Sequence, residues 1–285
     1  MTTNFSSEPD SLAIEPLAAP RWPAVGDGLR FADHLHPRPA PSGIDVRCGL
    51  QHFAIVTYAV DPVRFGGLLP PRFVLDAVEI DGKRRALMSV VPFIDVDFTS
   101  AVFPFPKFTM GQTNYRIYVV DTATGERCVW FLGTTLDSWA LAVPRRVWNL
   151  PWHAGRVRFD CDLDPATSLY RRYEMHTAAP WAPAALSLVQ RADDGLELPG
   201  FPDLETGLVF LTHPLAGFYH RRDGALGTYR VWHERLQVTP ARLVSARFGL
   251  LERLGLVTPE EQQVPHSVLV EPLNEFTIYL PPRRL

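Results

Sequence analysis

The chain has 285 residues, of which 46% are hydrophobic and 21% are charged, as expected for a globular protein with a substantial core. Its formal net charge of −3 provides no basic field for nucleic acid or an anionic membrane. The three cysteines are widely spaced and predict neither a disulfide framework nor a zinc site. We find no signal segment and no apolar run of bilayer length, so we expect a cytoplasmic protein without membrane or nucleic-acid partners.

Residues 1–45 are predicted to form a proline-rich, extended N-terminal arm. Each proline fixes φ and removes a backbone donor, so we expect neither a helix nor a central strand in this segment. The prolines that carry this prediction are Pro9, Pro16, Pro20, Pro23, Pro37, Pro39 and Pro41. Residues 46–285 are expected to form a single domain.

The rest of the chain has the alternating pattern and the closely spaced turn signals of a mainly β protein. A helix is predicted over 137–150, because Asp137 or Ser138 can cap it and Pro151 ends it. Two more helices are predicted over 62–69 and 247–256. Strands are predicted over 52–60, 85–97, 109–121, 127–135, 156–163, 169–177, 186–189, 208–211, 217–220, 228–232, 243–248, 266–270 and 276–280. Because tight turns join consecutive strands, we expect an antiparallel meander and no βαβ alternation.

One predicted strand, 109–121, carries polar side chains on one face. Alternate residues of a strand share a face, so Gln112, Asn114, Arg116 and Tyr118 point the same way. This face could meet solvent, as in an ordinary half-buried sheet. Alternatively it faces a barrel lumen, where the amides and the guanidinium would hold a carboxylate or carbonyl ligand.

Five segments of the chain resemble motifs of one known family. The segment Gln112-Thr-Asn-Tyr-Arg-Ile-Tyr-Val is similar to an E-L-N-V-R-T-Y-V strand. Further matches, in the same order as in that family, are Val129-Trp-Phe-Leu-Gly-Thr-Thr-Leu-Asp, Ala142-Val-Pro-Arg-Arg-Val-Trp-Asn-Leu-Pro-Trp-His, Val231-Trp-His-Glu-Arg-Leu-Gln-Val-Thr-Pro-Ala, and the tail from Leu254-Gly-Leu to Val264-Pro-His-Ser. Together they cover most of residues 50–285, and the family they resemble is the YqjF-like (DUF2071) family within the acetoacetate decarboxylase-like superfamily. The resemblance implies an antiparallel β-barrel, or double-β-cone, with a few short helices and one central cavity, and it points to a homo-oligomer.

The same resemblance sets an expectation about catalysis. Classical acetoacetate decarboxylases form an imine through a lysine, whose pKa is depressed by a second lysine beside it. At the matching positions this chain has Trp152 and His153, so we expect the imine nucleophile to be missing. A local Phe-Pro-Lys sequence ending at Lys107 imitates the decarboxylase motif. It precedes the polar strand, however, whereas the family's lysines follow it.

We therefore predict a small-molecule enzyme that works by acid–base, enolisation-type chemistry. Arg116 and Arg146 would anchor a carboxylate or an enolate oxygen, Gln112 would polarise a carbonyl, and His153 would move a proton. Asn114, Tyr118, Trp152 and His233 are further predicted to contact the substrate. The reaction would be dehydration, cyclisation or decarboxylation of a β-dicarbonyl or polyketide-like compound, with neither cofactor nor metal.

Two alternatives stay open at this point. The same lumen could hold a ligand without reacting with it, as in a binding protein. Lys107 could also act as an imine-forming residue despite its position. His153 and His233 each have a plain structural alternative, as histidines hydrogen-bonded to the backbone.

Overall fold

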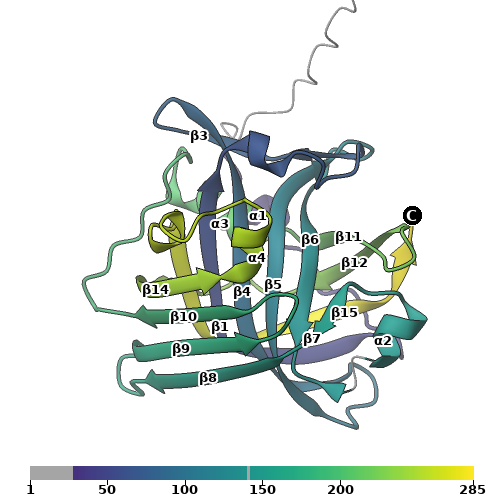
Figure 1. The fold of residues 1–285 in the computed structure, drawn as a ribbon. Coiled ribbons are helices and arrows are strands. Elements are labelled where there is room, and N and C mark those ends of the chain that lie inside the picture. Colours follow the sequence, from purple (N-terminus) through teal and green to yellow (C-terminus); the bar gives the residue numbers. More distant parts are fainter. Residues whose placement is uncertain (1–27, 140–141) are drawn as a thin grey trace, which may run out of the picture.

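The computed structural model describes residues 28–139 and 142–285, and strands dominate it (Figure 1). The strands are β1 (Val46–Val60), β2 (Phe73–Leu75), β3 (Ala77–Ile80), β4 (Lys83–Ser100), β5 (Phe108–Asp121), β6 (Arg127–Leu136), β7 (Trp152–Ala154), β8 (Arg156–Leu163), β9 (Tyr170–Ala178), β10 (Ala184–Val189), β11 (Ala216–His220), β12 (Leu226–Trp232), β13 (Thr239–Pro240), β14 (Arg242–Phe248) and β15 (Ser267–Arg284). The helices are α1 (Phe31–His34), α2 (Ala142–Val147), α3 (Leu204–Thr212) and α4 (Gly249–Arg253), with 3-10 turns η1 (Pro62–Phe65) and η3 (Glu261–Gln263).

Seven strands close into a barrel in the order β5-β4-β1-β15-β12-β11-β6, and β6 pairs again with β5. Neighbouring strands in this ring are antiparallel except β6 and β11, which are parallel. A ring with an odd number of strands cannot alternate direction throughout, so one parallel pair is unavoidable. Closure pairs the strand edges that an open sheet would leave free. The predicted β-barrel is thereby confirmed.

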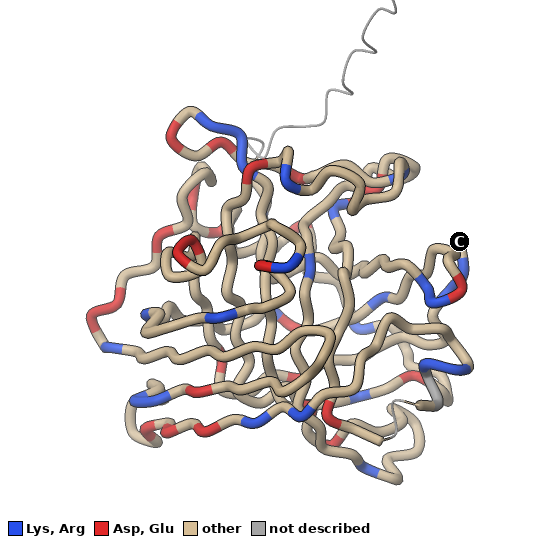
Figure 2. The backbone as a smooth tube through the Cα atoms, in the orientation of Figure 1, with Lys and Arg blue, Asp and Glu red and all other residues tan. Residues whose placement is uncertain are grey.

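A second sheet of four strands, in the order β14-β10-β9-β8, lies across the outside of the barrel (Figure 1, and as a backbone tube in Figure 2). Two cores result, one on each side of the barrel wall. Tyr115 and Ile117 of β5 point outward and pack with Tyr173 and Met175 of β9 in the core between the sheets. The opposite face of the barrel wall points into the lumen, where the second cluster gathers. Gly111 permits the close approach, since a Cβ there would lie 2.7 Å from Val157 of β8.

The hairpin between β3 and β4 shows how local sequence sets the register. Asp81 and Gly82 both have positive φ, 51° and 69°, as a two-residue primed turn requires. The turn pairs Ile80 with Lys83 and starts the long strand β4. The strands predicted over 85–97, 109–121 and 127–135 are confirmed as β4, β5 and β6, each slightly longer than expected.

Some predicted elements were wrong in type or length. Residues 208–211 belong to helix α3 and not to a strand, because Asp203 caps the backbone N–H of Thr206 and starts a helix there. The two strands predicted over 266–280 are one continuous strand, β15. The helix predicted over 137–150 is limited to α2, and residues 140–141 lie outside the described part of the chain.

The described part of the predicted arm, residues 28–45, packs onto the barrel domain. It contains the one-turn helix α1, so the expectation that the arm has no helix was wrong. Arg30 forms ion pairs with Asp203 (2.9 Å) and Glu205 (3.3 Å) of the α3 region, and Phe31 is buried. These contacts hold the segment against α3. Residues 1–27 of the arm lie outside the described residues. Among the described residues, no helix is long and apolar enough to cross a bilayer.

Candidate functional site

The barrel encloses a cavity of about 450 Å³, a volume within the range of ordinary small-molecule sites. Inward-facing residues of β1, β4, β5, β6, β12 and β15 form its walls, and the segments 148–152 and 212–217 complete them. Most lining side chains are apolar. The polar ones are Cys48, Asp95, Gln112, Asn114, Arg116, Ser138, Thr212, Tyr229 and His233. The polar face of β5 therefore points into the lumen and not to solvent.

Along β5, Gln112 and Asn114 form a hydrogen-bonded amide pair on the cavity wall. Gln112 Nε2 donates to Asn114 Oδ1 (2.9 Å), and Thr134 Oγ1 of β6 donates to the same oxygen (2.8 Å). Because two donors occupy the oxygen, the amide nitrogen of Asn114 is the end left for a ligand. The pair thus presents an oriented N–H donor to the cavity.

Arg116 lies two positions further along β5, where it forms no ion pair with any carboxylate in the described residues. Its Nη2 donates to the Leu211 carbonyl (2.9 Å) and to the Tyr118 hydroxyl (3.2 Å), while its buried Nε has no partner. Buried cations are ordinarily paired, because desolvating an unpaired charge is costly. A permanent cation without a counter-ion in an enclosed cavity is therefore suited to an anionic ligand.

Asp95 of β4 is a cavity residue that the sequence reasoning missed. Its carboxyl is 2% exposed, and one oxygen, Oδ2, has no hydrogen-bond partner. Burial raises the pKa of Asp95 to about 7, opposed by a hydrogen bond with the Cys48 thiol. Burial likewise raises the pKa of Cys48, which therefore stays a protonated donor. The available signal was an acid at an inward position of a strand predicted over 85–97, on the same face as Val91 and Phe93.

The strand register fixes how these groups are spaced. Asp95 pairs with Met110 and Phe93 pairs with Gln112, so Asp95 and Gln112 are diagonal neighbours across β4 and β5. Such neighbours lie about 7–8 Å apart, close enough to act on one small molecule. Arg116 is four positions beyond Gln112. The carboxyl, the amide pair and the guanidinium therefore follow one another along a single wall.

Tyr229 and His233 complete the polar lining from β12 and the segment after it. Burial raises the pKa of Tyr229. The charge of Asp95 adds to this rise, and the charge of Arg116 opposes it. His233 Nδ1 donates to the Glu234 carbonyl (2.7 Å), which leaves Nε2 as an acceptor. Burial, with smaller contributions from His213 and Arg116, lowers the pKa of His233 to about 3. It is therefore a neutral acceptor at physiological pH.

Three of the residues predicted for the site do not line this cavity. His153 stacks on Trp181, with ring centroids 3.9 Å apart and planes 4° apart, and burial lowers its pKa to about 4. Its neighbour Trp152 does line the cavity, as alternation along β7 requires. Arg146 is exposed on α2. Tyr118 is buried beside the cavity, where its hydroxyl donates to the Leu211 carbonyl (3.0 Å). We therefore assign no proton transfer to His153.

Neither lysine of the chain lines the cavity. Lys83 opens β4 at the exposed β3–β4 turn. Lys107 is 52% exposed and forms an ion pair with Asp97 (2.7 Å) just before β5. Imine chemistry requires a lysine amine in a desolvated pocket or beside another cation, and neither lysine has such an environment.

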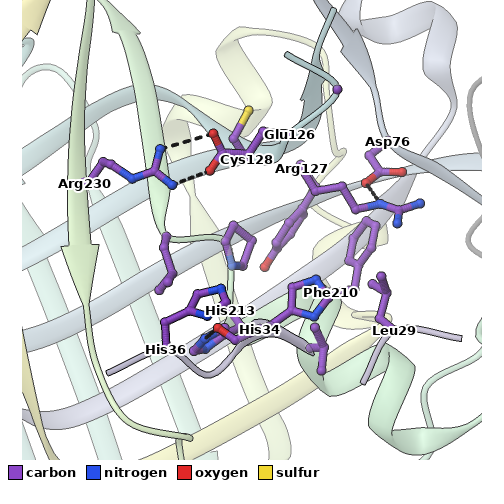
Figure 3. Close-up of a pocket in the computed structure, with 15 residues that line it drawn as sticks. Leu29, His34, His36, Asp76, Glu126, Arg127, Cys128, Phe210, His213 and Arg230 are labelled. Carbon is purple, nitrogen blue, oxygen red and sulfur yellow. Dashed lines mark hydrogen bonds and ion pairs between the residues drawn. The ribbon is translucent and has the colours of Figure 1, made fainter. Parts of the chain in front are cut away.

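A second, smaller pocket lies between the N-terminal segment, α3 and the start of β6 (Figure 3). Arg127 pairs with Asp76 (2.8 Å) and Arg230 with Glu126 (2.6 Å), opposite a group of three histidines, His34, His36 and His213. Its charged side chains are thus matched within the protein. In the described chain, no group of three or more His, Cys, Asp or Glu side chains could hold a metal ion.

Comparison with solved structures identifies the class of fold. An acetoacetate decarboxylase-like enzyme from Sphingomonas wittichii RW1 matches with a TM-score of 0.53 at 16% identity, covering 86% of this chain and 93% of that one. Acetoacetate decarboxylase from Legionella pneumophila matches with a TM-score of 0.53 at 14% identity, covering 91% of this chain and 97% of that one. The enduracididine biosynthesis enzyme MppR, complexed with pyruvate, matches with a TM-score of 0.50 at 14% identity, covering 92% of this chain and 97% of that one. This chain therefore has the acetoacetate decarboxylase-like fold.

Within that class the family follows from the sequence. The model of DUF2071, described as an uncharacterized conserved protein, matches residues 47–272. The chain belongs to this family, as its motifs predicted. None of the curated proteins matches the sequence.

Proposed function

We propose that the protein is an enzyme that enolises a carbonyl compound bearing an anionic group several bonds from the reacting carbon, without forming an imine. The observation that carries this proposal is the placement of Asp95, Gln112, Asn114 and Arg116 along one wall of the enclosed cavity. These groups have complementary tasks: an anion anchor, an oriented amide donor, and a carboxyl that can exchange protons near neutral pH.

In the proposed step, the ligand's carbonyl oxygen accepts a hydrogen bond from the second N–H of the Gln112 amide, the diagonal neighbour of Asp95, and a carboxylate further along the ligand binds Arg116. Ionised Asp95 removes a proton from the carbon next to that carbonyl. The electron pair of the broken C–H bond moves onto the carbonyl oxygen, and the resulting enolate is stabilised by the amide donor. Asp95 then returns the proton to carbon or to a leaving group, which accommodates dehydration and cyclisation equally.

Burial gives Asp95 the property that this step needs. A base is most effective when its pKa lies near the working pH, and burial raises the pKa of Asp95 to about 7. An exposed aspartate would be ionised but too weakly basic. Asp95 therefore takes the role that the sequence had suggested for His153, whose side chain stacks on Trp181 away from the cavity.

The test is proton exchange at carbon. The purified protein is incubated in D₂O with a panel of oxo acids and 1,3-dicarbonyls, and proton NMR follows loss of the α-hydrogen signal and any new product. We expect at least one compound to exchange faster than in buffer. Asp95→Asn should slow this exchange at least 100-fold, the usual contribution of a general base. Wild-type exchange at the buffer rate for the whole panel would contradict the proposal, and a tightly held, unaltered ligand in native mass spectrometry would favour a binding protein.

A further inference from the structure

The cavity is far more apolar than its polar wall alone suggests, and it is long. Phe108 and Arg116 both line it from β5 and are eight positions apart, roughly 25 Å along a fully extended strand. The rest of the lining is mostly apolar, with side chains from β1, β6, β15 and the segment 148–152. They include Leu50, Phe53, Phe131, Leu136, Trp152 and Phe276.

The exposure of the lining residues shows where the cavity opens. Trp139 is 82% exposed and Ile44 is 52% exposed, and both line the cavity. Trp139 also packs edge-on against Phe108, with ring centroids 6.2 Å apart. The mouth is therefore apolar and lies at the Phe108 end of β5.

Arg116 lies at the opposite, closed end. Around it are the buried Tyr118, the Leu211 carbonyl at the end of α3, and His233, which is 3% exposed. Among the described residues that line the cavity, Asp95 is the only other side chain that can carry a charge at neutral pH, since burial keeps His233 neutral. The cavity thus has one permanent cation at its closed end and an apolar passage from there to the mouth.

We infer that the substrate is an amphiphile whose carboxylate binds at Arg116 and whose acyl or aryl chain fills the apolar passage toward Trp139. A four-carbon oxo acid would leave most of the passage empty or filled with poorly held water. A longer chain replaces that space with apolar contacts. This inference deepens the proposed function and rests on it only for the identity of the anchoring residue.

Equilibrium binding tests the inference without any turnover. Saturated carboxylates from butanoate to dodecanoate, each below its micellar concentration, are titrated by calorimetry. Affinity should rise about three- to fourfold per methylene until the chain reaches the mouth, and then level off. Alcohols of equal length should bind at least tenfold more weakly, and Arg116→Met should abolish that difference. An affinity independent of chain length, or alcohols that bind as well as carboxylates, would overturn the inference.

Trp139 offers a variant that leaves the fold undisturbed, because its side chain is largely in solvent. Trp139→Ala should weaken the longest carboxylates about fivefold and leave butanoate unchanged. Val264→Ala, another exposed apolar side chain but not a cavity residue, is the matched control and should change neither. Equal loss for short and long chains in Trp139→Ala would contradict the proposed direction of binding.

The outcomes separate this inference from the proposed function. A chain-length dependence without exchange of any oxo acid would refute the enolisation and keep the amphiphilic ligand. Exchange that is as fast for four-carbon as for ten-carbon oxo acids would refute the amphiphilic substrate and keep the enolisation.

Discussion

The carboxyl of Asp95 and the thiol of Cys48 are hydrogen-bonded to each other inside the cavity wall, on neighbouring strands β4 and β1. Both groups are buried, and burial raises the pKa of each. The thiol remains protonated and acts as a donor, so the pair carries at most one negative charge, on Asp95. This charge appears only as the pH approaches neutrality, so the proposed catalysis and the stability of the fold should both depend on pH.

The rate of α-proton exchange should rise with pH and level off above the pKa of Asp95, about 7. Only the ionised carboxylate can accept a proton from carbon, so kcat/KM should follow one ionisation in the free enzyme. Initial rates between pH 5 and pH 9 would show this profile. Cys48→Ala removes the hydrogen bond that lowers the pKa of Asp95. The midpoint of the pH–rate profile of this variant should therefore move to higher pH. A flat profile in the wild type would remove Asp95 from the chemistry.

Asp95 should also make the folded protein less stable as pH rises from about 4 to about 7. Its pKa is higher in the folded state than its ordinary value of 3.8, so in this window the unfolded chain is ionised while the folded protein retains the proton. The full effect is about 4 kcal/mol at most, present below pH 4 and lost through pH 7. Buried His233 acts in the opposite sense between about pH 3 and pH 6.5, because its pKa is lowered from 6.5 to about 3.

Urea unfolding of wild type and Asp95→Asn at pH 5 and pH 8 isolates this contribution, since His233 is common to both proteins. The free energy of unfolding of Asp95→Asn minus that of wild type should increase by about 2 kcal/mol or more on going from pH 5 to pH 8. An equal difference at both pH values would show that Asp95 titrates normally.

His153 should contribute to stability and not to catalysis. Its ring lies flat on Trp181, outside the cavity, and such a contact is worth about 1 kcal/mol. His153→Ala should therefore lower the free energy of unfolding by about that amount and keep exchange rates within about twofold of wild type. Circular dichroism melts and the NMR exchange assay measure the two effects. A tenfold loss of rate without loss of stability would return His153 to the site.

Local pattern was sufficient to predict β5, because period-two alternation depends only on neighbouring residues. It placed Gln112, Asn114 and Arg116 on one face. The alternation could not decide between solvent and lumen, since that depends on barrel closure by strands far apart in the chain. Asp95 was missed for a related reason. The inward direction of its side chain follows from its strand, but its burial depends on the neighbouring strand β1, which brings Cys48 against it, and on closure of the barrel.

Other residues show where motif matching fails. The motif resemblance matched Trp152 and His153 to the positions of the decarboxylase lysines, and β7 alternation directs only Trp152 into the cavity. The sequence does not say which of two neighbours points inward. The four-residue apolar run at 208–211 had the same ambiguity, since short runs suit a strand or a helix equally. The Asp203 cap was the signal that decides for a helix.

Gly133 on β6 should be intolerant of a side chain. Its φ is +155°, and a Cβ there would lie 2.7 Å from the Trp181 ring and 3.1 Å from the Pro151 carbonyl. Gly133→Ala should lower the free energy of unfolding by about 2 kcal/mol through steric overlap and backbone strain. Gly195→Ala is the control, since it is exposed and nothing lies within 4 Å of its Cβ position. Equal urea midpoints for the two variants would refute this account of Gly133.

Lys107 should form no imine with an oxo acid. Its side chain is half in solvent and its ammonium is paired with Asp97, whereas an imine-forming lysine is activated in a desolvated pocket or beside another cation. Treatment with an oxo acid and borohydride, followed by intact-mass measurement, should show no reduced adduct. Lys107→Met should retain the wild-type exchange rate, and Lys83→Met is the control for nonspecific modification of an exposed lysine. An adduct that maps to Lys107, lost in Lys107→Met but not in Lys83→Met, would instead establish a Schiff-base mechanism and displace Asp95 from its proposed role.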